Sequence, residues 1–182
     1  ETAKQIAKSL IENKGHVVLG RVARGTAEFM TLRVLANEIA RLIEGKSGIL
    51  PALANEVGAQ LVGCIPHKSA FNGYNTKGLN ARQMLSQERK AYVLLNTELE
   101  QDSYSGQEAL ASLNKADTVV VMTAYVNEDM LIYADVILPI TPFTETAGSY
   151  VNMEGTWQKF NGVTRPLGDS KPAWKVIRVL AN

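Results

Sequence analysis

Four short runs of this chain are apolar from end to end, and they restrict the folds open to it. They cover residues 16–20, 91–95, 118–122 and 135–138. A strand with one face in water alternates apolar and polar residues, whereas the strands of a parallel sheet are covered on both faces and read as continuous apolar runs. The four runs therefore predict a three-layer α/β domain with a mostly parallel sheet.

Amphipathic segments alternate with these strands, as βαβ units require. The clearest is a helix predicted over residues 26–44, which has an apolar stripe and a stop at Gly45. The stripe consists of Phe29, Leu32, Leu35, Ile39, Leu42 and Ile43. The other predicted elements are helices over residues 2–13 (stopped by Gly15), 52–57, 106–113 and 128–133, a helix from Pro172 onward and a short strand over 157–160.

The region from Gly48 to Ser86 is otherwise irregular and rich in glycine. A structureless insert of this length inside a compact domain is usually a functional or interface loop. No repeat, low-complexity tract or linker divides the chain, so we expect residues 1–182 to form a single domain. Because the chain starts at Glu1 without an initiator Met or a signal peptide, we also expect it to be a segment excised from a longer protein.

Composition narrows the classes of partner. The net charge is +1, from 19 basic and 18 acidic residues, and no basic block exceeds residues 88–90, which does not favour a nucleic-acid surface. No apolar run approaches the roughly 20 residues that span a bilayer, so direct membrane insertion is not expected. The single cysteine, Cys64, excludes an internal disulfide and an iron–sulfur cluster held by four thiolates of this segment.

The segment Gly20–Thr26 lies between a predicted strand and a predicted helix, where a phosphate-binding loop would lie. It has the GxxxxG spacing, but Thr26 stands where a P-loop needs Lys, so NTP hydrolysis is not favoured. Arg21 and Arg24 leave anion binding open, although two glycines shaping a tight turn is the favoured interpretation. No GxGxxG occurs, so the dinucleotide fingerprint for NADH is absent.

Metal binding and nucleophilic catalysis find little support in the sequence. His16 and His67 are the only histidines, and only His67 lies near Cys64. A metal site needs three or four convergent ligands, so we predict no metal site and expect Cys64 to be a small buried hydrophobe. No hydroxyl or thiol is accompanied by a base and an orienting group, so no catalytic residue is predicted.

A long polar loop, Thr141–Gln158, follows the strand that Pro139 ends, and loops at the carboxyl ends of strands are where α/β folds bind ligands. Asp135, Glu145 and Glu154 allow an acid–base pair, but structural roles in turns and strand pairing are favoured. We expect the loop glycines, Gly148 and Gly155, to adopt positive φ angles. Tyr150 and Trp157 are large enough to anchor the loop.

The segment Ala134–Gln158 closely resembles a signature of the molybdopterin oxidoreductase superfamily, whose fold is Rossmann-like. Residues 55–66 resemble an N-x-V-G-A-x-x-x-G-x-x-P stretch of the large iron–sulfur subunit of respiratory complex I, the proton-pumping NADH:quinone oxidoreductase. Residues 165–178 resemble the Pro-Gly-x-Ala-x-x-Asp-Trp-x-Ile-x-Arg ending of the same family. Together the three segments extend the resemblance over most of residues 49–182.

The resemblance implies a large subunit in the peripheral arm of complex I, on the cytoplasmic side and peripheral to the inner (plasma) membrane. Its N-terminal part carries the iron–sulfur clusters, and its C-terminal part resembles a molybdenum enzyme without the metal. Other peripheral-arm subunits are then the expected partners. The counterparts of the cofactor loop are Gly148, Asn152, Glu154 and Gly155, which we expect to be vestigial.

Departures from the family pattern favour a retained scaffold over a retained pterin site. Thr146 and Thr156 replace two basic side chains, and charge-assisted contacts are the strong ones to phosphate. Ala173 replaces the Asp before Trp. Three hypotheses stay open: a non-catalytic structural segment of an electron-transfer complex, the cofactor-binding domain of a molybdopterin-guanine-dinucleotide oxidoreductase, and a nucleotide- or anion-binding module that uses Gly20–Thr26.

Overall fold

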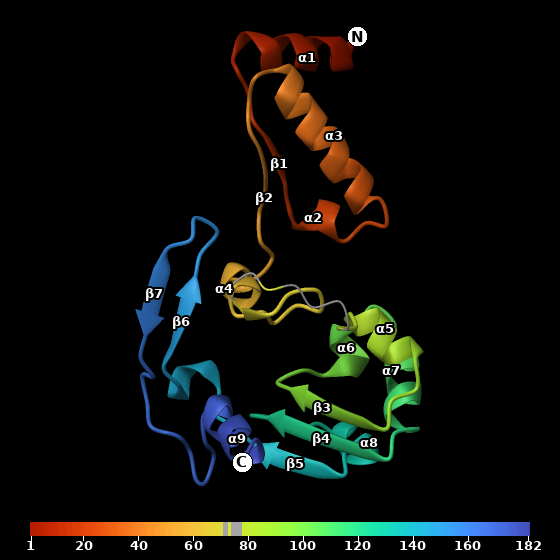
Figure 1. Cartoon of the computed structure of the whole chain (residues 1–182), viewed down its shortest axis with the longest axis vertical. Helices are drawn as coiled ribbons and strands as arrows, with labels where there is room; N and C mark the ends of the chain where they lie inside the picture. The colour runs from red at the N-terminus through yellow and green to blue at the C-terminus, as the bar shows by residue number, and fades with distance from the viewer. Residues whose placement is uncertain (71–72, 74–77) are drawn as a thin grey trace. The chain divides into compact units, whose positions relative to one another are not determined.

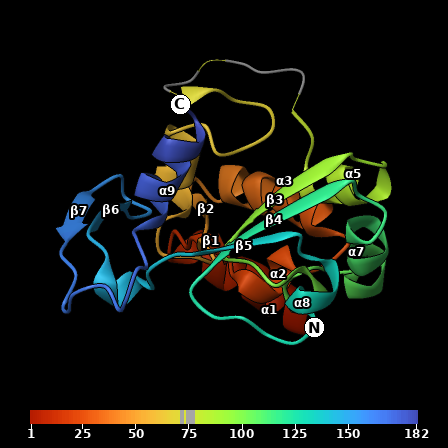
Figure 2. The ribbon, with the colours of Figure 1, turned by 90° about the horizontal axis from the view of Figure 1, so that it is seen from below.

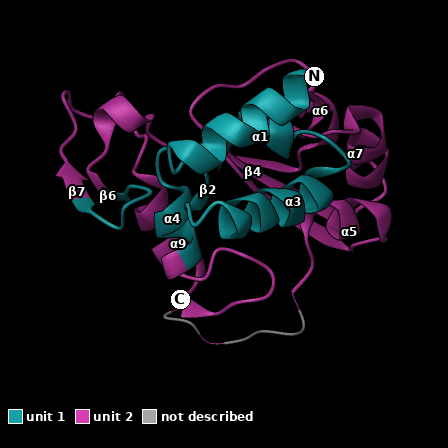
Figure 3. Ribbon diagram, turned by 90° about the horizontal axis from the view of Figure 1, so that it is seen from above, with its two compact units in different colours: residues 1–60, 150–157 teal, residues 61–149, 158–182 magenta. Residues whose placement is uncertain are grey.

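The computed structural model of the chain describes residues 1–70, 73 and 78–182. It has an α/β fold with parallel strand pairing, which confirms the predicted class. Its contacts divide the chain into two compact units, coloured separately in Figure 3. Unit 1 comprises residues 1–60 and 150–157, and unit 2 comprises residues 61–149 and 158–182. The expectation of a single domain over residues 1–182 stays a prediction.

Unit 1 is built on one βαβ arrangement (Figure 1). Its elements are α1 (Thr2–Glu12), β1 (Val17–Leu19), α2 (Arg21–Arg24), α3 (Phe29–Leu42), β2 (Ser47–Ile49) and the start of α4 (Glu56–Leu61). β1 and β2 pair in parallel, with Val18 opposite Gly48. On α3 the deeply buried positions are Ala36 and Ala40, whereas Leu35 and Leu42 of the predicted stripe are more than half exposed. The stripe is therefore misplaced, because small residues allow the helix to approach the strands closely.

Two helices of unit 1 end in the same way. The residue before each stop glycine takes a left-handed conformation, Lys14 after α1 (φ 48°) and Glu44 after α3 (φ 53°). The glycine N–H then reaches back into the helix, with Gly45 donating to the Ala40 carbonyl at 2.9 Å. A Cβ on Gly45 would lie 2.1 Å from the Gly15 carbonyl oxygen. The predicted stops are confirmed, and at Gly45 the reason for glycine is close backbone approach.

Unit 2 contains a three-stranded parallel sheet in the order β3-β4-β5, whose strands lie side by side in Figure 2. Its elements up to the hairpin are α5 (Ala81–Ser86), β3 (Ala91–Leu95), α6 (Leu99–Asp102), α7 (Gly106–Leu113), β4 (Thr118–Thr123), α8 (Met130–Tyr133), β5 (Val136–Pro139) and η2 (Phe143–Glu145). Helix α9 (Ala173–Leu180) follows Pro172, as the sequence predicts. Most of these elements lie within two residues of their predicted bounds.

The core of unit 2 lies on one face of this sheet. Val119 and Val121 of β4 pack there with Leu113 of α7 and Met130 of α8, and all four are essentially inaccessible. On the opposite face the side chains of β3 are open, since Val93 is 63% exposed. The prediction that each apolar run is covered on both faces is therefore wrong for β3. Its residues alternate between buried and exposed because no helix of the described chain packs over the second face.

The two regions expected to be irregular contain regular elements. The loop Thr141–Gln158 holds η2 and the first strand of a two-stranded hairpin, β6 (Gly148–Val151) with β7 (Trp157–Phe160). The region from Gly48 to Ser86 holds the end of β2, α4 and α5, and α4 begins four residues later than predicted. Residues 71–72 and 74–77 of that region lie outside the described residues. None of the helices in the described chain has the length and apolarity needed to cross a bilayer.

Candidate functional site

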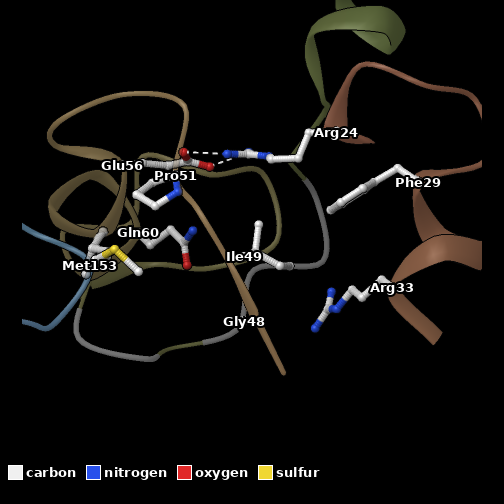
Figure 4. A pocket seen from close by; sticks show the side chains of 10 residues that line it. Arg24, Phe29, Arg33, Gly48, Ile49, Pro51, Glu56, Gln60 and Met153 are labelled. Carbon is white, nitrogen blue, oxygen red and sulfur yellow. Dashed lines mark hydrogen bonds and ion pairs between the residues drawn. The ribbon is translucent and has the colours of Figure 1, made fainter. Parts of the chain in front are cut away.

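A hollow of about 450 Å³ lies in unit 1, where β1 and β2 end (Figure 4). One part of its lining is polar and comprises Arg24, Arg33, Glu56 and Gln60. The rest is apolar or glycine and comprises Phe29, Gly48, Ile49, Pro51, Val57 and Met153. Because parallel strands leave their carboxyl ends at one edge, the loops and helices that follow them converge there, which is the usual position of ligands in α/β folds.

An ion pair crosses one side of the hollow. Arg24 Nη1 donates to Glu56 Oε2 at 2.7 Å, and Arg24 Nη2 donates to Glu56 Oε1. The Ala52 N–H also donates to Glu56 Oε2, at 2.9 Å. The hydrogen bonds from Arg24 lower the pKa of the Glu56 carboxyl and raise the pKa of the Arg24 guanidinium. Both groups are therefore charged at neutral pH, and Glu56 holds Arg24 in a fixed position.

Arg24 reaches the hollow because the segment Gly20–Thr26 is largely helical. Arg21–Arg24 form α2, and the Thr26 hydroxyl donates to the Ala23 carbonyl at 2.8 Å. Gly20 and Gly25 have φ angles of −89° and −82°, which any residue adopts. The interpretation of two glycines shaping a tight turn is therefore wrong. A four-residue helix supplies the turn, and Thr26 closes it with its side chain.

Arg33 supplies a second cation from α3, and Figure 4 shows it extending toward Gly48 of β2. A smaller hollow of about 230 Å³ shares Arg33, Gly48 and Ile49 with the first. No acidic side chain of the described residues forms an ion pair with Arg33. The hollow therefore carries one neutralised arginine and one that is not neutralised.

The N-x-V-G-A segment joins the hollow to the tip of the hairpin. Asn55 Oδ1 accepts a hydrogen bond from the Val151 N–H at 2.9 Å, although the two residues are 96 positions apart. A Cβ on Gly58 would lie 2.1 Å from the same Asn55 oxygen, so glycine is needed there. Met153, at the hairpin tip, lines the hollow. The structure thus brings together Arg24 of one sequence candidate and part of the loop that formed the other.

The four loop candidates build the hairpin turn. Asn152 Oδ1 accepts from the backbone N–H groups of Glu154 and Thr156, at 3.0 and 2.9 Å. Gly155 has φ 84°, which confirms the expected positive angle. The same expectation is wrong for Gly148, where a Cβ would instead lie 2.6 Å from the Phe160 ring. The Asn152 side chain is consequently occupied by its own turn.

The three carboxylates of the loop region are not gathered into an acid–base pair. Glu145 Oε2 accepts from the Leu167 N–H at 3.1 Å, and Asp135 Oδ2 accepts from the Val119 N–H at 2.7 Å. Both lie in unit 2, whereas Glu154 lies in unit 1. The favoured structural roles of Asp135 and Glu145 are confirmed, because each anchors a backbone N–H.

The histidines and the cysteine are dispersed. His16 Nδ1 accepts from the Lys46 N–H at 3.1 Å, which ties the start of β1 to the start of β2. Cys64 is exposed, so the expectation of a buried cysteine is wrong. It follows the short helix α4, which leaves its side chain at the surface. Within residues 1–70, 73 and 78–182 no group of three or more His, Cys, Asp or Glu residues could hold a metal ion.

A polar cluster that the sequence did not indicate lies at the carboxyl end of β3. Glu100 Oε1 accepts from the Asn127 amide at 2.9 Å, and Glu100 Oε2 accepts from the Tyr133 hydroxyl at 3.3 Å. Burial, together with the nearby Glu100 charge, raises the pKa of Tyr133. Glu98 and Asp102 belong to the same loop and helix, so this edge of the sheet is acidic.

The ion pair of Arg24 with Glu56 is the functional feature that sequence reasoning missed. The two residues are 32 positions apart, and neither lies in a pattern that indicates its partner. Arg24 is a sequence candidate only through its position in Gly20–Thr26, and Glu56 only through the segment that starts at Asn55. Pairing them requires the parallel register of β1 with β2.

Comparison with known proteins gives this architecture a family. The model of the family described as molybdopterin oxidoreductase matches residues 8–182. "Putative formate dehydrogenase SH0748" of Staphylococcus haemolyticus is 38% identical over 71 residues, and "Putative formate dehydrogenase SAR2393" of Staphylococcus aureus is 39% identical over 72 residues. Each match covers 39–40% of this chain and 7% of the relative. Since the family match covers nearly the whole chain, the chain belongs to the molybdopterin oxidoreductase family.

Proposed function

We propose that this chain is a non-catalytic structural segment of the large iron–sulfur subunit of NADH:quinone oxidoreductase. In this role it supports electron transfer from NADH to quinone, while iron–sulfur clusters in another part of the parent protein carry the electrons. Its partners are other subunits of the peripheral arm, at the cytoplasmic side of the membrane. The observation that carries the proposal is the internal use of the loop groups, because Asn152 and Glu145 accept backbone hydrogen bonds.

The residues of the loop do not fit a molybdopterin guanine dinucleotide. Such a cofactor presents phosphate groups, and phosphate is held best by charge-assisted hydrogen bonds. The loop carries Thr146 and Thr156 where basic side chains would be needed. At the carboxyl end of β3 the chain presents Glu98, Glu100 and Asp102, and carboxylates repel a phosphate. Both observations support a scaffold over a cofactor site.

Metal and pterin analysis of the purified parent protein tests the proposal. We expect iron and acid-labile sulfide from the clusters, with molybdenum, tungsten and pterin far below one per chain. Pterin at one or more equivalents per chain would overturn the scaffold proposal, because the family's cofactor would then be bound.

Glutamate substitutions in the loop give a functional test in the assembled complex. Glu145→Gln and Glu154→Gln are expected to leave NADH:quinone turnover per assembled complex within about twofold of wild type. The amide oxygen introduced by Glu145→Gln can still accept from Leu167, and the Glu154 carboxylate makes no hydrogen bond or ion pair among the described residues. Turnover and the amount of assembled complex are measured together. Normal assembly with turnover lowered by more than about tenfold would show that the loop takes part in catalysis.

A second candidate is the cofactor-binding domain of a molybdopterin-guanine-dinucleotide oxidoreductase. The family match and the two relatives named as formate dehydrogenases support it. Under this alternative, the hollow with Arg24 and Arg33 is the part of the chain with basic groups for a phosphate. The same pterin analysis separates the two candidates, since this one requires a stoichiometric pterin cofactor.

A further inference from the structure

We propose that the hollow of unit 1 is a binding site for a small phosphate-type oxyanion, and that the Glu56 carboxylate blocks it by acting as an internal ligand of Arg24. This inference does not depend on the proposed function, because it concerns the residues that line the hollow and needs neither a pterin nor an electron-transfer partner.

The geometry of the ion pair resembles that of a bound anion. Both Nη atoms of Arg24 donate to the two oxygens of one carboxylate, which is the bidentate arrangement that arginine also makes with phosphate. A third donor, the Ala52 N–H, binds one of the same oxygens at 2.9 Å. The donors that an oxyanion would use are thus already directed at one point.

A second cation remains available at the same hollow. Arg33 lines it from α3 and has no acidic partner among the described residues. The two arginines and one carboxylate leave one net positive charge in the lining. A phosphate group carries about one and a half to two negative charges near neutral pH, whereas a carboxylate carries one. It therefore interacts more strongly than Glu56 with the two arginines together.

The remaining lining favours a small charged ligand over bulk water. Phe29, Ile49 and Val57 give the hollow apolar walls, and the Gln60 amide adds a neutral hydrogen-bonding group. The side chains of Arg24 and Glu56 are only 28% and 24% exposed. Charge interactions are stronger beside apolar walls than in open water because the effective dielectric constant is lower. A volume of about 450 Å³ accommodates a pyrophosphate and lies in the usual range for ligand sites.

Removing the internal ligand tests the proposal directly. Inorganic pyrophosphate is titrated into the 182-residue chain by calorimetry, for wild type and for Glu56→Gln. We expect Glu56→Gln to bind at least about tenfold more tightly than wild type, because Arg24 is then no longer neutralised. Adding Arg33→Gln to Glu56→Gln is expected to reverse most of the gain, since the second cation is lost.

Glu38→Gln is the matched control. Glu38 forms hydrogen bonds of 2.9 and 2.6 Å with Arg41, also on unit 1, but neither residue lines the hollow. It changes the net charge as Glu56→Gln does, so it is expected to bind pyrophosphate as weakly as wild type. Equal affinity in Glu56→Gln and Glu38→Gln would overturn the proposal.

A spectroscopic measurement covers the case in which Glu56→Gln does not fold. In the wild-type chain, saturating pyrophosphate is expected to shift the NMR signals of the Arg24 and Arg33 side chains and leave those of Arg41 unchanged. Shifts at Arg41 equal to those at Arg24 would indicate general screening of charge, and would equally contradict a specific site.

Discussion

Gly148 and Gly155 stand near opposite ends of the β6–β7 hairpin segment, and different physical constraints require glycine at each. Gly155 has φ 84°, a region that side chains strain, whereas Gly148 lies against the Phe160 ring. At Gly148, space rather than backbone conformation is limiting. The distinction matters because the loop then owes its glycines to the shape of the turn, with no need for a bound cofactor to approach the backbone.

Substitution at these glycines is expected to lower stability. Gly155→Val should reduce the free energy of unfolding by about 1–3 kcal/mol through backbone strain. Gly148→Val should reduce it by roughly 1–3 kcal/mol through overpacking against Phe160. Gly48→Ala is the control, since a Cβ there meets no atom within 4 Å. Urea unfolding measures all three. A Gly155→Val protein as stable as the Gly48→Ala protein would contradict the strain argument.

At the scale of the element, helix α5 shows how local chemistry can define a helix that has little apolar pattern. Asn80 Oδ1 accepts from the Gln83 N–H at 2.9 Å, and Gln83 Oε1 accepts from the Asn80 N–H at 3.0 Å. This reciprocal capping box satisfies two N–H groups that the first turn of a helix leaves free. The helix lies in the region for which the sequence predicts irregular structure, and its cap explains why it forms there.

Removal of the cap is expected to destabilise α5. Asn80→Ala should lower the free energy of unfolding by about 0.5–2 kcal/mol, the usual effect of losing a side-chain N-cap. Arg82→Ala, near the start of the same helix, should change it by less than about 0.5 kcal/mol, because the exposed side chain forms no ion pair among the described residues. Thermal and urea unfolding compare the two. Equal effects would show that the cap contributes nothing particular.

At the scale of the whole molecule, the stability of unit 2 is concentrated on one face of its sheet. Val121 is fully buried among the core residues of β4, α7 and α8, and Val93 on the neighbouring strand is 63% exposed. The two valines belong to the same parallel pair of strands, so they differ mainly in which face they occupy. Only one of them contributes substantially to the burial of apolar surface.

A paired substitution measures this asymmetry. Val121→Thr should lower the free energy of unfolding by roughly 1–3 kcal/mol, because it buries a hydroxyl group that lacks a partner. Val93→Thr should change it by less than about 0.5 kcal/mol, because the new hydroxyl faces water. Both changes keep a β-branched side chain, so strand propensity is nearly constant. Similar losses for both variants would mean that the outer face of β3 is covered in the folded chain.

Much of unit 2 could be predicted from the sequence. Strands β3, β4 and β5 and helix α7 follow from short-range apolar patterns, which report directly on burial along one element. Strand β2 could not, because Ser47 and Gly48 have no strand pattern and pair only because β1 offers a parallel neighbour. The prediction for the outer face of β3 is wrong for a related reason, since an apolar residue does not state whether another element will cover it.

The sequence by itself determined the α/β class, the parallel strands and the glycine-dependent turn at Gly155, because these depend on neighbours within a few residues. It also determined the family, through segments whose spacing is continuous along the chain. Only the tertiary structure decided the hollow, because Arg24 and Glu56 meet across 32 residues and Asn55 and Val151 across 96. Such contacts depend on how strands pair, and no local pattern of residues contains that information.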